Sequence, residues 1–183
     1  MSMLSRLSIL GKGVPDTPTY IEDVFSTWLY TGTGATQAIP NGLDLAGKGG
    51  MVWTKSRDAF IGRIFDTNRG VTKFLTPSAS TGETTTANTL TSFDSTGFTL
   101  GSANPGPNAS GPYVSWAFRE QAKFFDVVTY TGNGANQTIA HNLGSVPGCI
   151  MVKRTDSTGG DWQVYHRSIA NTEYLVLLSL IHI

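Results

Sequence analysis

Charged side chains are scarce in this sequence. Only 14% of the 183 residues are Asp, Glu, Lys or Arg, against a usual share of about 25%. The 13 basic residues balance the 13 acidic ones, so the net charge is zero. A neutral chain has no basic field for a nucleic-acid backbone and no polybasic face for an anionic membrane. We therefore expect neither a nucleic-acid partner nor insertion into a membrane.

Residues that carry catalysis or bind metals are equally scarce. The single cysteine, Cys149, excludes a disulfide framework within the chain, and its apolar neighbours predict a buried strand residue rather than a nucleophile. His141 and His166 lie far apart, and no pair of residues has the spacing of a zinc site. Neither a Gly-x-Ser-x-Gly elbow nor a recurring carboxylate pair indicates hydrolysis. The sequence thus predicts a non-enzymatic protein with no catalytic residue, metal or cofactor.

A glycine-rich segment, residues 42–49, comes close to a phosphate-binding loop. The position after Lys48 should be Ser or Thr to bind magnesium, and here it is Gly49. No helical pattern follows, because Met51 and its neighbours have the composition of a strand. We therefore interpret the segment as a loop between strands.

The residues that are abundant predict strands and turns. Gly, Thr, Ser and Asn make up 70 of the 183 residues, and 9 Phe, 6 Tyr and 4 Trp accompany them. No window shows a sustained helical period, and short strand patterns alternate with turn clusters. This predicts an all-β, antiparallel β-sandwich, with concanavalin-like and jelly-roll topologies both open. In residues 113–118 the larger apolar set is Val114, Trp116 and Phe118, so we expect that set to face the core.

An internal repeat organises the chain. The segment YTGTGATQAI, residues 30–39, returns 100 residues later as YTGNGANQTI. Between residues 25–75 and 125–175, 13 of 51 aligned positions are identical, where chance gives about three. The first copy continues through further strand patterns as far as Phe118, and the second copy has no such half. We therefore predict a complete β-sandwich repeat at 20–124 and a truncated one at 125–177.

The two ends of the chain are expected to stand apart from these repeats. Residues 1–19 have no signal-peptide pattern and indicate a flexible arm. The last six residues, 178–183, read as the translation of a transposon-end sequencing adapter, which would make the chain a fragment of a longer gene from environmental DNA. The alternative is a short hydrophobic strand at the end of the protein.

Loops and exposed aromatic side chains are the candidate contact points. Residues 76–88 and 101–112 are rich in turn-forming residues and are predicted to be surface loops. Trp53 and Trp162 flank the hairpin region that differs most between the copies. Because binding residues favour variable loops on a rigid scaffold, both are candidate ligand contacts. The alternative is that both tryptophans fill the sandwich core.

Two stretches resemble a known group of proteins. They are YVSWAFREQAKFFDVVTYTGNGANQTIAHNLGSVPGCIMVKRTDSTGGDWQVYHRS, residues 113–168, and FDTNRGVTKFL…TLTSFDSTGFTLGS, within residues 65–102. They are similar to a repeated β domain of virion structural proteins from tailed phages, especially marine and cyanobacterial ones. The resemblance covers residues 20–177.

This resemblance implies a tail-fibre or virion-surface module that displays lectin-like β-sandwich repeats. Its expected partners are other virion proteins, further copies of itself (a homo-oligomer, with a trimer as one option) and host-surface glycans. Its expected location is the virion, which is assembled in the host cytoplasm and requires no signal peptide. A bacterial carbohydrate-binding or adhesion module and a polysaccharide depolymerase are the alternatives.

Overall fold

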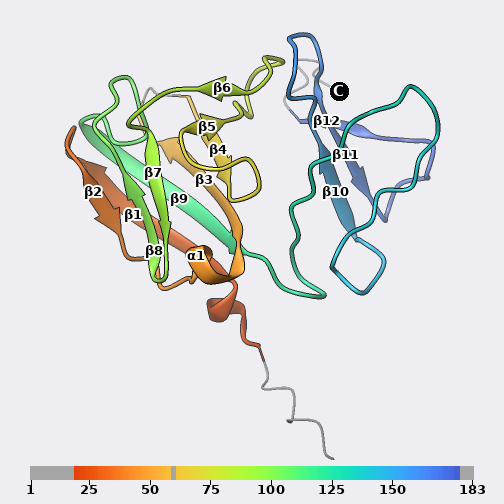
Figure 1. Ribbon diagram of the computed structural model, residues 1–183, viewed down its shortest axis with the longest axis horizontal. Helices are drawn as coiled ribbons and strands as arrows, with labels where there is room; N and C mark the ends of the chain where they lie inside the picture. The colour runs from red at the N-terminus through yellow and green to blue at the C-terminus, as the bar shows by residue number, and fades with distance from the viewer. Residues whose placement is uncertain (1–18, 59–60, 178–183) are drawn as a thin grey trace, which may run out of the picture.

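The computed structural model describes residues 19–58 and 61–177 (Figure 1). The predicted adapter-encoded tail and all but the last residue of the predicted arm lie outside these ranges. Within them, the prediction of an all-β protein is confirmed, and no helix has the length and apolarity needed to cross a bilayer. The elements are η1 Ile21–Asp23, β1 Phe25–Gly32, β2 Gln37–Ile39, α1 Leu45–Lys48, β3 Gly50–Ser56, β4 Arg63–Asp66, β5 Lys73–Phe74, β6 Thr84–Thr85, β7 Leu90–Asp94, β8 Gly97–Leu100, β9 Gly111–Arg119, β10 Cys149–Val152, β11 Trp162–His166 and β12 Leu175–Leu177.

Residues 20–124, here called the first module, form an antiparallel β-sandwich. One sheet has the strand order β1-β9-β3-β4 and the other has the order β2-β8-β7. Every ladder in both sheets is antiparallel, which confirms the predicted sandwich class. The β5–β6 hairpin joins the first sheet through a bridge between Ile64 and Leu75. The long strand β9 lies between β1 and β3 and therefore holds the larger sheet together.

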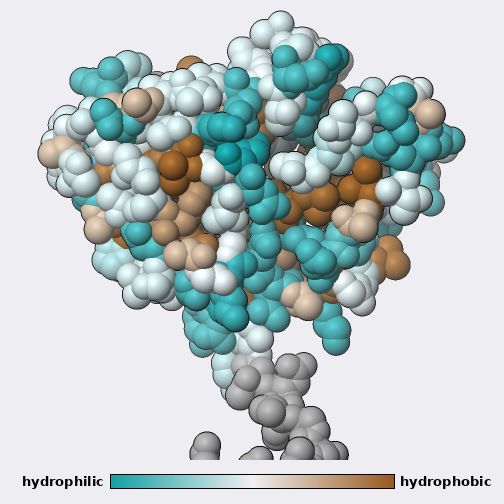
Figure 2. All heavy atoms as spheres, viewed as in Figure 1, coloured by the Kyte–Doolittle hydropathy of each residue, from teal (hydrophilic) through white to brown (hydrophobic). Residues whose placement is uncertain are grey.

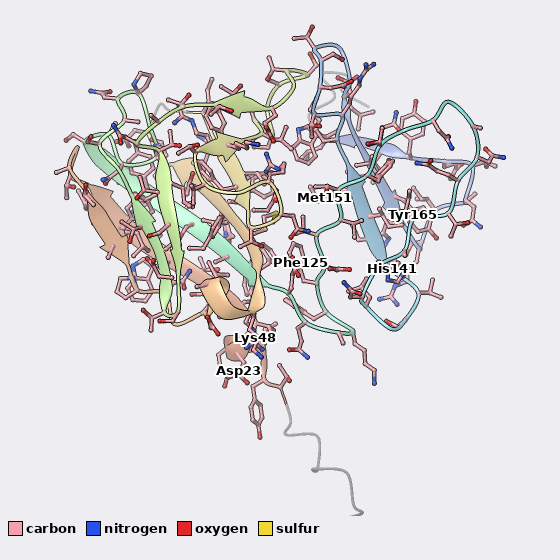
Figure 3. The ribbon with its side chains drawn as sticks, in the orientation of Figure 1. Asp23, Lys48, Phe125, His141, Met151 and Tyr165 are labelled. Atoms are coloured by element: carbon pink, nitrogen blue, oxygen red, sulfur yellow. The ribbon has the colours of Figure 1, made fainter. Side chains whose placement is uncertain are left out.

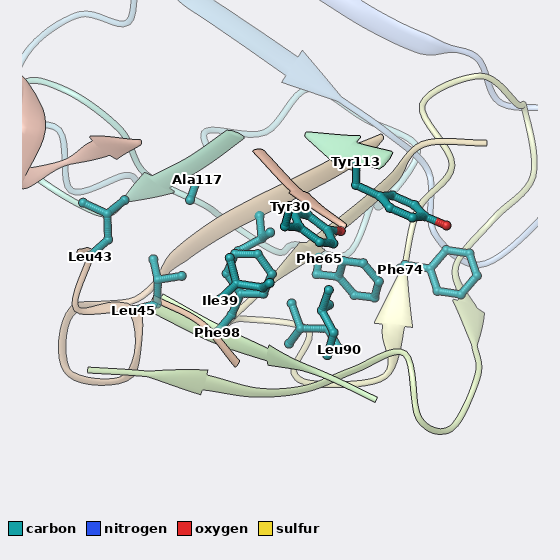
Figure 4. Close-up of a cluster of buried hydrophobic side chains, with 12 residues drawn as sticks. Tyr30, Ile39, Leu43, Leu45, Phe65, Phe74, Leu90, Phe98, Tyr113 and Ala117 are labelled. Atoms are coloured by element: carbon teal, nitrogen blue, oxygen red, sulfur yellow. The ribbon is translucent and has the colours of Figure 1, made fainter. Parts of the chain in front are cut away.

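A continuous apolar core fills the space between the two sheets (Figure 4). The rings of Tyr30 and Tyr113 stack there with centroids 5.2 Å apart. Their hydroxyls donate to the carbonyl oxygens of Pro107 and Gly106, at 2.6 and 3.1 Å. The polar ends of both rings are thus satisfied, as buried tyrosines require. The core residues are Tyr30, Ile39, Leu43, Leu45, Val52, Phe65, Phe74, Leu90, Phe98, Leu100, Tyr113 and Ala117.

Strand β9 buries the face opposite to the one predicted from its sequence. Ser115 and Ala117 are fully buried together with Tyr113, whereas Trp116 and Phe118 lie on the outer face and are only partly buried. The expectation that the larger apolar set faces the core is therefore wrong. Large rings from neighbouring strands already fill the space between the sheets, and interiors are close-packed, so only small side chains fit at the middle of β9.

The loop that precedes β9 is part of the core structure. Asn108 is fully buried, and its side-chain oxygen accepts a hydrogen bond from the Thr33 backbone at 3.1 Å. Its amide donates to the Gly101 carbonyl oxygen at 3.1 Å and also to that of Ala35. The prediction of a plain surface loop at 101–112 is therefore wrong for its buried part. The Asn108 side chain thus hydrogen-bonds the backbone of Thr33 and Ala35, which lie in the repeated Gly-x-Gly-Ala segment after β1.

Residues 125–177, here called the second module, form a small antiparallel sheet of order β10-β11-β12. An apolar cluster joins this sheet to the outer face of the first module. In the described part of the second module, Trp162 is the one residue classed as buried. The second module therefore has almost no core of its own and owes its packing to the first module. The members of this interface cluster are Met51, Trp53, Ile64 and Leu75 from the first module and Trp162 and Leu177 from the second.

The loop 76–88 provides polar contacts at the same interface. The backbone N–H of Glu83 donates to the Thr155 carbonyl at 2.7 Å, and that of Gly159 donates to the Ser80 carbonyl at 3.1 Å. The prediction of a surface loop is wrong for Thr84–Thr85, which form β6, and the segment also docks the second module.

Candidate functional site

Two tryptophans lie side by side on the outer face of the four-stranded sheet. Trp53 of β3 and Trp116 of β9 are directly opposite in register, with ring centroids 5.9 Å apart and ring planes at 71°. Residues directly opposite on paired strands project from the same face of a sheet. Both rings remain partly exposed. The sheet thus holds two large aromatic surfaces at fixed positions outside the core.

The two rings line an open groove with a volume of about 410 Å³. Glycine at position 62 keeps this groove open, since a Cβ atom there would lie 3.2 Å from the indole nitrogen of Trp53 and 3.3 Å from Cγ of Pro77. The remaining lining residues are Lys55, Ile61, Gly62, Pro77 and Ser78.

The groove combines apolar surface with a small number of polar groups. Lys55 supplies an ammonium group, whose Nζ donates to the Ser56 carbonyl at 3.0 Å, and Ser78 supplies a hydroxyl. Aromatic faces carry a partial negative charge, which attracts the weakly positive C–H groups on the flat side of a sugar ring. A largely apolar site with few polar groups is the usual form of a small-ligand site. The chemistry of the groove therefore suits a saccharide.

Trp162, the other predicted contact residue, has a different place. It is only 6% exposed, and its indole nitrogen donates to the Thr76 carbonyl at 3.1 Å. The structure therefore brings Trp53 and Trp162 into one interface cluster, and of the two only Trp53 faces the groove. The alternative that both fill the sandwich core is wrong, because Trp53 lies partly exposed on the outer face of the sheet and Trp162 lies between the modules.

Trp116 is the groove residue that the sequence interpretation missed. The alternation in β9 correctly places Trp116 on one face with its apolar neighbours, but it predicts that this face is turned to the core. The available signal was the run of small residues on the other face, Ser115 and Ala117, which fits a space already filled by rings from other strands.

The remaining chemical candidates are structural. Among the described residues, no group of three or more His, Cys, Asp or Glu side chains is placed to hold a metal ion. Cys149 is exposed, so the prediction that it is buried is wrong. At the glycine-rich loop, the carboxylate of Asp44 accepts the backbone N–H of Gly47 at 2.8 Å. The segment continues into β3 as predicted, but the expectation of a plain loop is wrong for Leu45–Lys48, which form the short helix α1 with Asp44 as its N-cap.

A second hollow, of about 240 Å³, lies where the chain passes from β9 into the second module. Glu120 lines it together with Phe125 and Asp126, and Phe125 lies between the two modules (Figure 3). Burial, followed by the negative charges of Asp126 and Asp66, raises the pKa of Glu120 above its ordinary value. The folded state is therefore more stable, relative to the unfolded state, when this carboxyl group is protonated.

The fold and the groove together define an antiparallel β-sandwich protein with an aromatic groove on the outer face of one sheet. The chain belongs to the DUF7483 family, described as a domain of unknown function, whose sequence profile matches residues 21–181. The match spans both modules and extends into the segment for which an adapter origin is predicted. Comparison with curated proteins and with solved structures gave no match.

Proposed function

We propose that this protein is a non-enzymatic structural module of a tailed-phage virion, of the tail-fibre or surface type, that contacts host-surface glycans. The observation that carries the glycan contact is the open groove with Trp53 and Trp116 side by side. The resemblance of residues 20–177 to virion structural proteins supports the virion location.

The scaffold supports this function because it fixes the two rings. Both tryptophans stand on strands in the interior of a four-stranded sheet, and β9 is bonded on both sides. Ligand binding there orders few protein groups, so little of the contact free energy is lost as conformational entropy. Repeated presentation of such contacts in an oligomer would multiply their affinity.

The two alternative functions, a polysaccharide depolymerase and a bacterial carbohydrate-binding module, make different predictions. A polysaccharide depolymerase requires two carboxyl groups facing each other across about 5–10 Å. Among the described residues that line the groove, Lys55 and Ser78 supply the polar side chains and none is acidic. A bacterial carbohydrate-binding module would share the same groove and would differ in remaining with the bacterial cell envelope.

The glycan contact is tested by measuring binding of the full chain to immobilised bacterial surface polysaccharides. We expect Trp116→Ala to weaken binding by about tenfold, the upper value for the loss of one aromatic contact. Trp28→Ala is the matched control, because Trp28 is exposed and lies on β1 outside the groove. Trp116 is a sharper probe than Trp53, which also belongs to the interface cluster.

Three results would contradict the proposal. Equal losses for Trp116→Ala and Trp28→Ala would remove the groove from the explanation. Shortening of a bound polysaccharide would identify a depolymerase. Mass spectrometry of purified phage particles that carry the gene should detect the protein, and recovery of the protein only from the bacterial envelope would favour the adhesion module.

A further inference from the structure

The two modules share one strand arrangement over part of their length. In the first module Ile64 is bridged to Leu75, and in the second Val164 pairs with Leu175, at an offset of 100 residues for both partners. The hairpins β3–β4 and β10–β11 also correspond, although Met151 is paired two residues away from the position equivalent to that of Met51. A shift of two residues leaves the side chains on the same face. The sheet β10-β11-β12 is therefore the counterpart of β3-β4-β5.

The turns of the repeated motif also correspond. The backbone N–H of Ala35 donates to the Thr33 hydroxyl at 3.3 Å, and that of Ala135 donates to the Asn133 side-chain oxygen at 2.9 Å. Gly34 and its counterpart Gly134 have similar positive φ angles, 69° and 75°. The second module thus reproduces the local conformation of the first even where it forms no sheet.

Strands β1 and β2 of the first module have no strand as a counterpart in the second module, and both are paired with β8 or β9. In the first module, β1 is paired with β9 alone and β2 with β8 alone. Residues 125–132 and 137–139 are their counterparts, and neither segment is a strand. No counterpart of β8 or β9 occurs in the described residues. These segments therefore have the sequence of a strand but no strand partner in the described residues. Phe125 instead exchanges both main-chain hydrogen bonds with Gln121, and the Val127 carbonyl accepts from the Asn68 side chain.

The second module exposes apolar groups whose counterparts in the first module are buried. Val152 is 37% exposed, whereas its counterpart Val52 is fully buried. Tyr130 is 52% exposed, whereas its counterpart Tyr30 is buried against Tyr113 of β9. Ile150 and Met151 are exposed as well, and Figure 2 shows hydrophobic surface in the region of β10. Val52 packs in the core between the two sheets of the first module, so the exposure of Val152 corresponds to the absence of a facing sheet. The exposure of Tyr130 corresponds to the absence of the Tyr113 ring of β9.

Within the described ranges, β10 has a strand partner on one side only. The four residues of β10, Cys149–Val152, include no proline or charged side chain. Exposed apolar edge strands without such residues are templates for pairing with another strand. In the view of Figure 1, residues 125–130 pass on the side of β10 away from β11. In the first module, β9 lies between β1 and β3, which are the counterparts of residues 125–132 and of β10.

We propose that β10 and the segment 125–132 form an acceptor site for an extended peptide of the β9 type, supplied from outside the two modules. The peptide lies antiparallel to β10, as β9 lies antiparallel to β3, and forms main-chain hydrogen bonds with both segments. It carries a tyrosine at the position of Tyr113, which stacks on Tyr130. It also carries small residues at the positions of Ser115 and Ala117. This inference concerns the second module and is independent of the glycan groove.

The first module shows which kind of peptide the acceptor site should bind. The same repeat unit holds a β9-type strand in its first copy, where Asn108, Tyr30 and Tyr113 fasten the loop before it. The counterparts of Asn108 and Tyr113 would have to come with the bound peptide. A synthetic peptide of residues 106–119 therefore contains every group that the acceptor site requires.

Binding of this labelled peptide to the full chain provides the test. We expect saturable binding, measured by fluorescence anisotropy, and new amide protection against hydrogen exchange at residues 125–132 and 149–152. Tyr130→Ala should weaken binding by about three- to tenfold, the worth of one aromatic pair. Tyr174→Ala is the matched control, because Tyr174 is exposed and lies outside both β10 and residues 125–132. A peptide with Ser115→Pro should not bind, because proline removes a ladder hydrogen bond.

Other results would overturn the proposal. Protection confined to the first module would show that the peptide only exchanges with β9. Equal effects of Tyr130→Ala and Tyr174→Ala, or no binding at all, would exclude the acceptor site. Protection of residues 149–152 that rises with protein concentration in the absence of peptide would show that a second copy covers β10 instead.

Discussion

Replacement of Trp162 by alanine is expected to release the second module while the first stays folded. Trp162 is the one buried residue of the second module in the described ranges, and it packs on Ile64 and Leu75. Removing a buried tryptophan costs about 3–5 kcal/mol. Each 1.4 kcal/mol corresponds to about a factor of ten, so the undocked population should rise by about a hundredfold to several thousandfold. The Thr76 carbonyl also loses its indole donor.

Hydrogen exchange followed by mass spectrometry measures this effect strand by strand. We expect amides of β10, β11 and β12 to lose protection in Trp162→Ala, while β9 keeps its protection. Trp162→Phe retains most of the apolar contact and removes only the hydrogen bond, so its effect should be smaller. Trp28→Ala, at a 37% exposed position, is the control. The reasoning is refuted if β9 loses protection together with β11, or if Trp162→Ala behaves like Trp28→Ala.

Two further predictions concern the repeated motif and the junction between modules. Gly32→Ala should cost about 3 kcal/mol in a denaturant titration, because its Cβ would lie 2.0 Å from the Ala109 carbonyl oxygen. Gly132→Ala, with nothing within 4 Å, should change stability by less than about 0.5 kcal/mol; equal costs would contradict this. Since burial and Asp126 raise the pKa of Glu120 above 4.5, the folded state binds more protons than the unfolded one. The ionised Glu120 carboxylate therefore destabilises the folded state, an effect that is absent below the ordinary pKa and grows as pH rises. Glu120→Gln should stabilise the protein at neutral pH and not at about pH 4. Equal effects of Glu120→Gln at both pH values would refute the raised pKa as the cause.

The sequence predicts the fold class because its strongest signals are local. Turn residues and strand composition identify the strands of the first module, and the 100-residue repeat predicts that β11 and β12 correspond to β4 and β5. The buried face of β9 could not be predicted in the same way. Which face of β9 is buried depends on the space left between the sheets by the tyrosine pair and the rings of Phe65 and Phe98. These rings come from strands far apart in sequence.

The candidate site is predicted only in part for a related reason. Trp53 and Trp162 occupy similar places in the sequence pattern, beside the variable hairpin. What separates them is docking between the modules, which buries Trp162 and leaves Trp53 at the edge of the groove. No local pattern reports such docking. A side chain at position 62 would crowd the indole of Trp53, and this proximity appears only once the strands are paired.

Comparison of the two modules separates the strands that form by local contacts from those that require distant ones. The unit β3-β4-β5 is built from neighbouring segments, and its counterpart β10-β11-β12 is present without β9. The pairing of β1 with β9 joins Phe25 to Phe118 and closes most of the first module into one loop. Such distant pairings require the entropy of loop closure to be overcome before their contacts contribute. When the distant partner is absent, as for residues 125–132, the segment keeps its turns and loses its sheet. The same dependence on a distant partner underlies the proposed acceptor site on the second module.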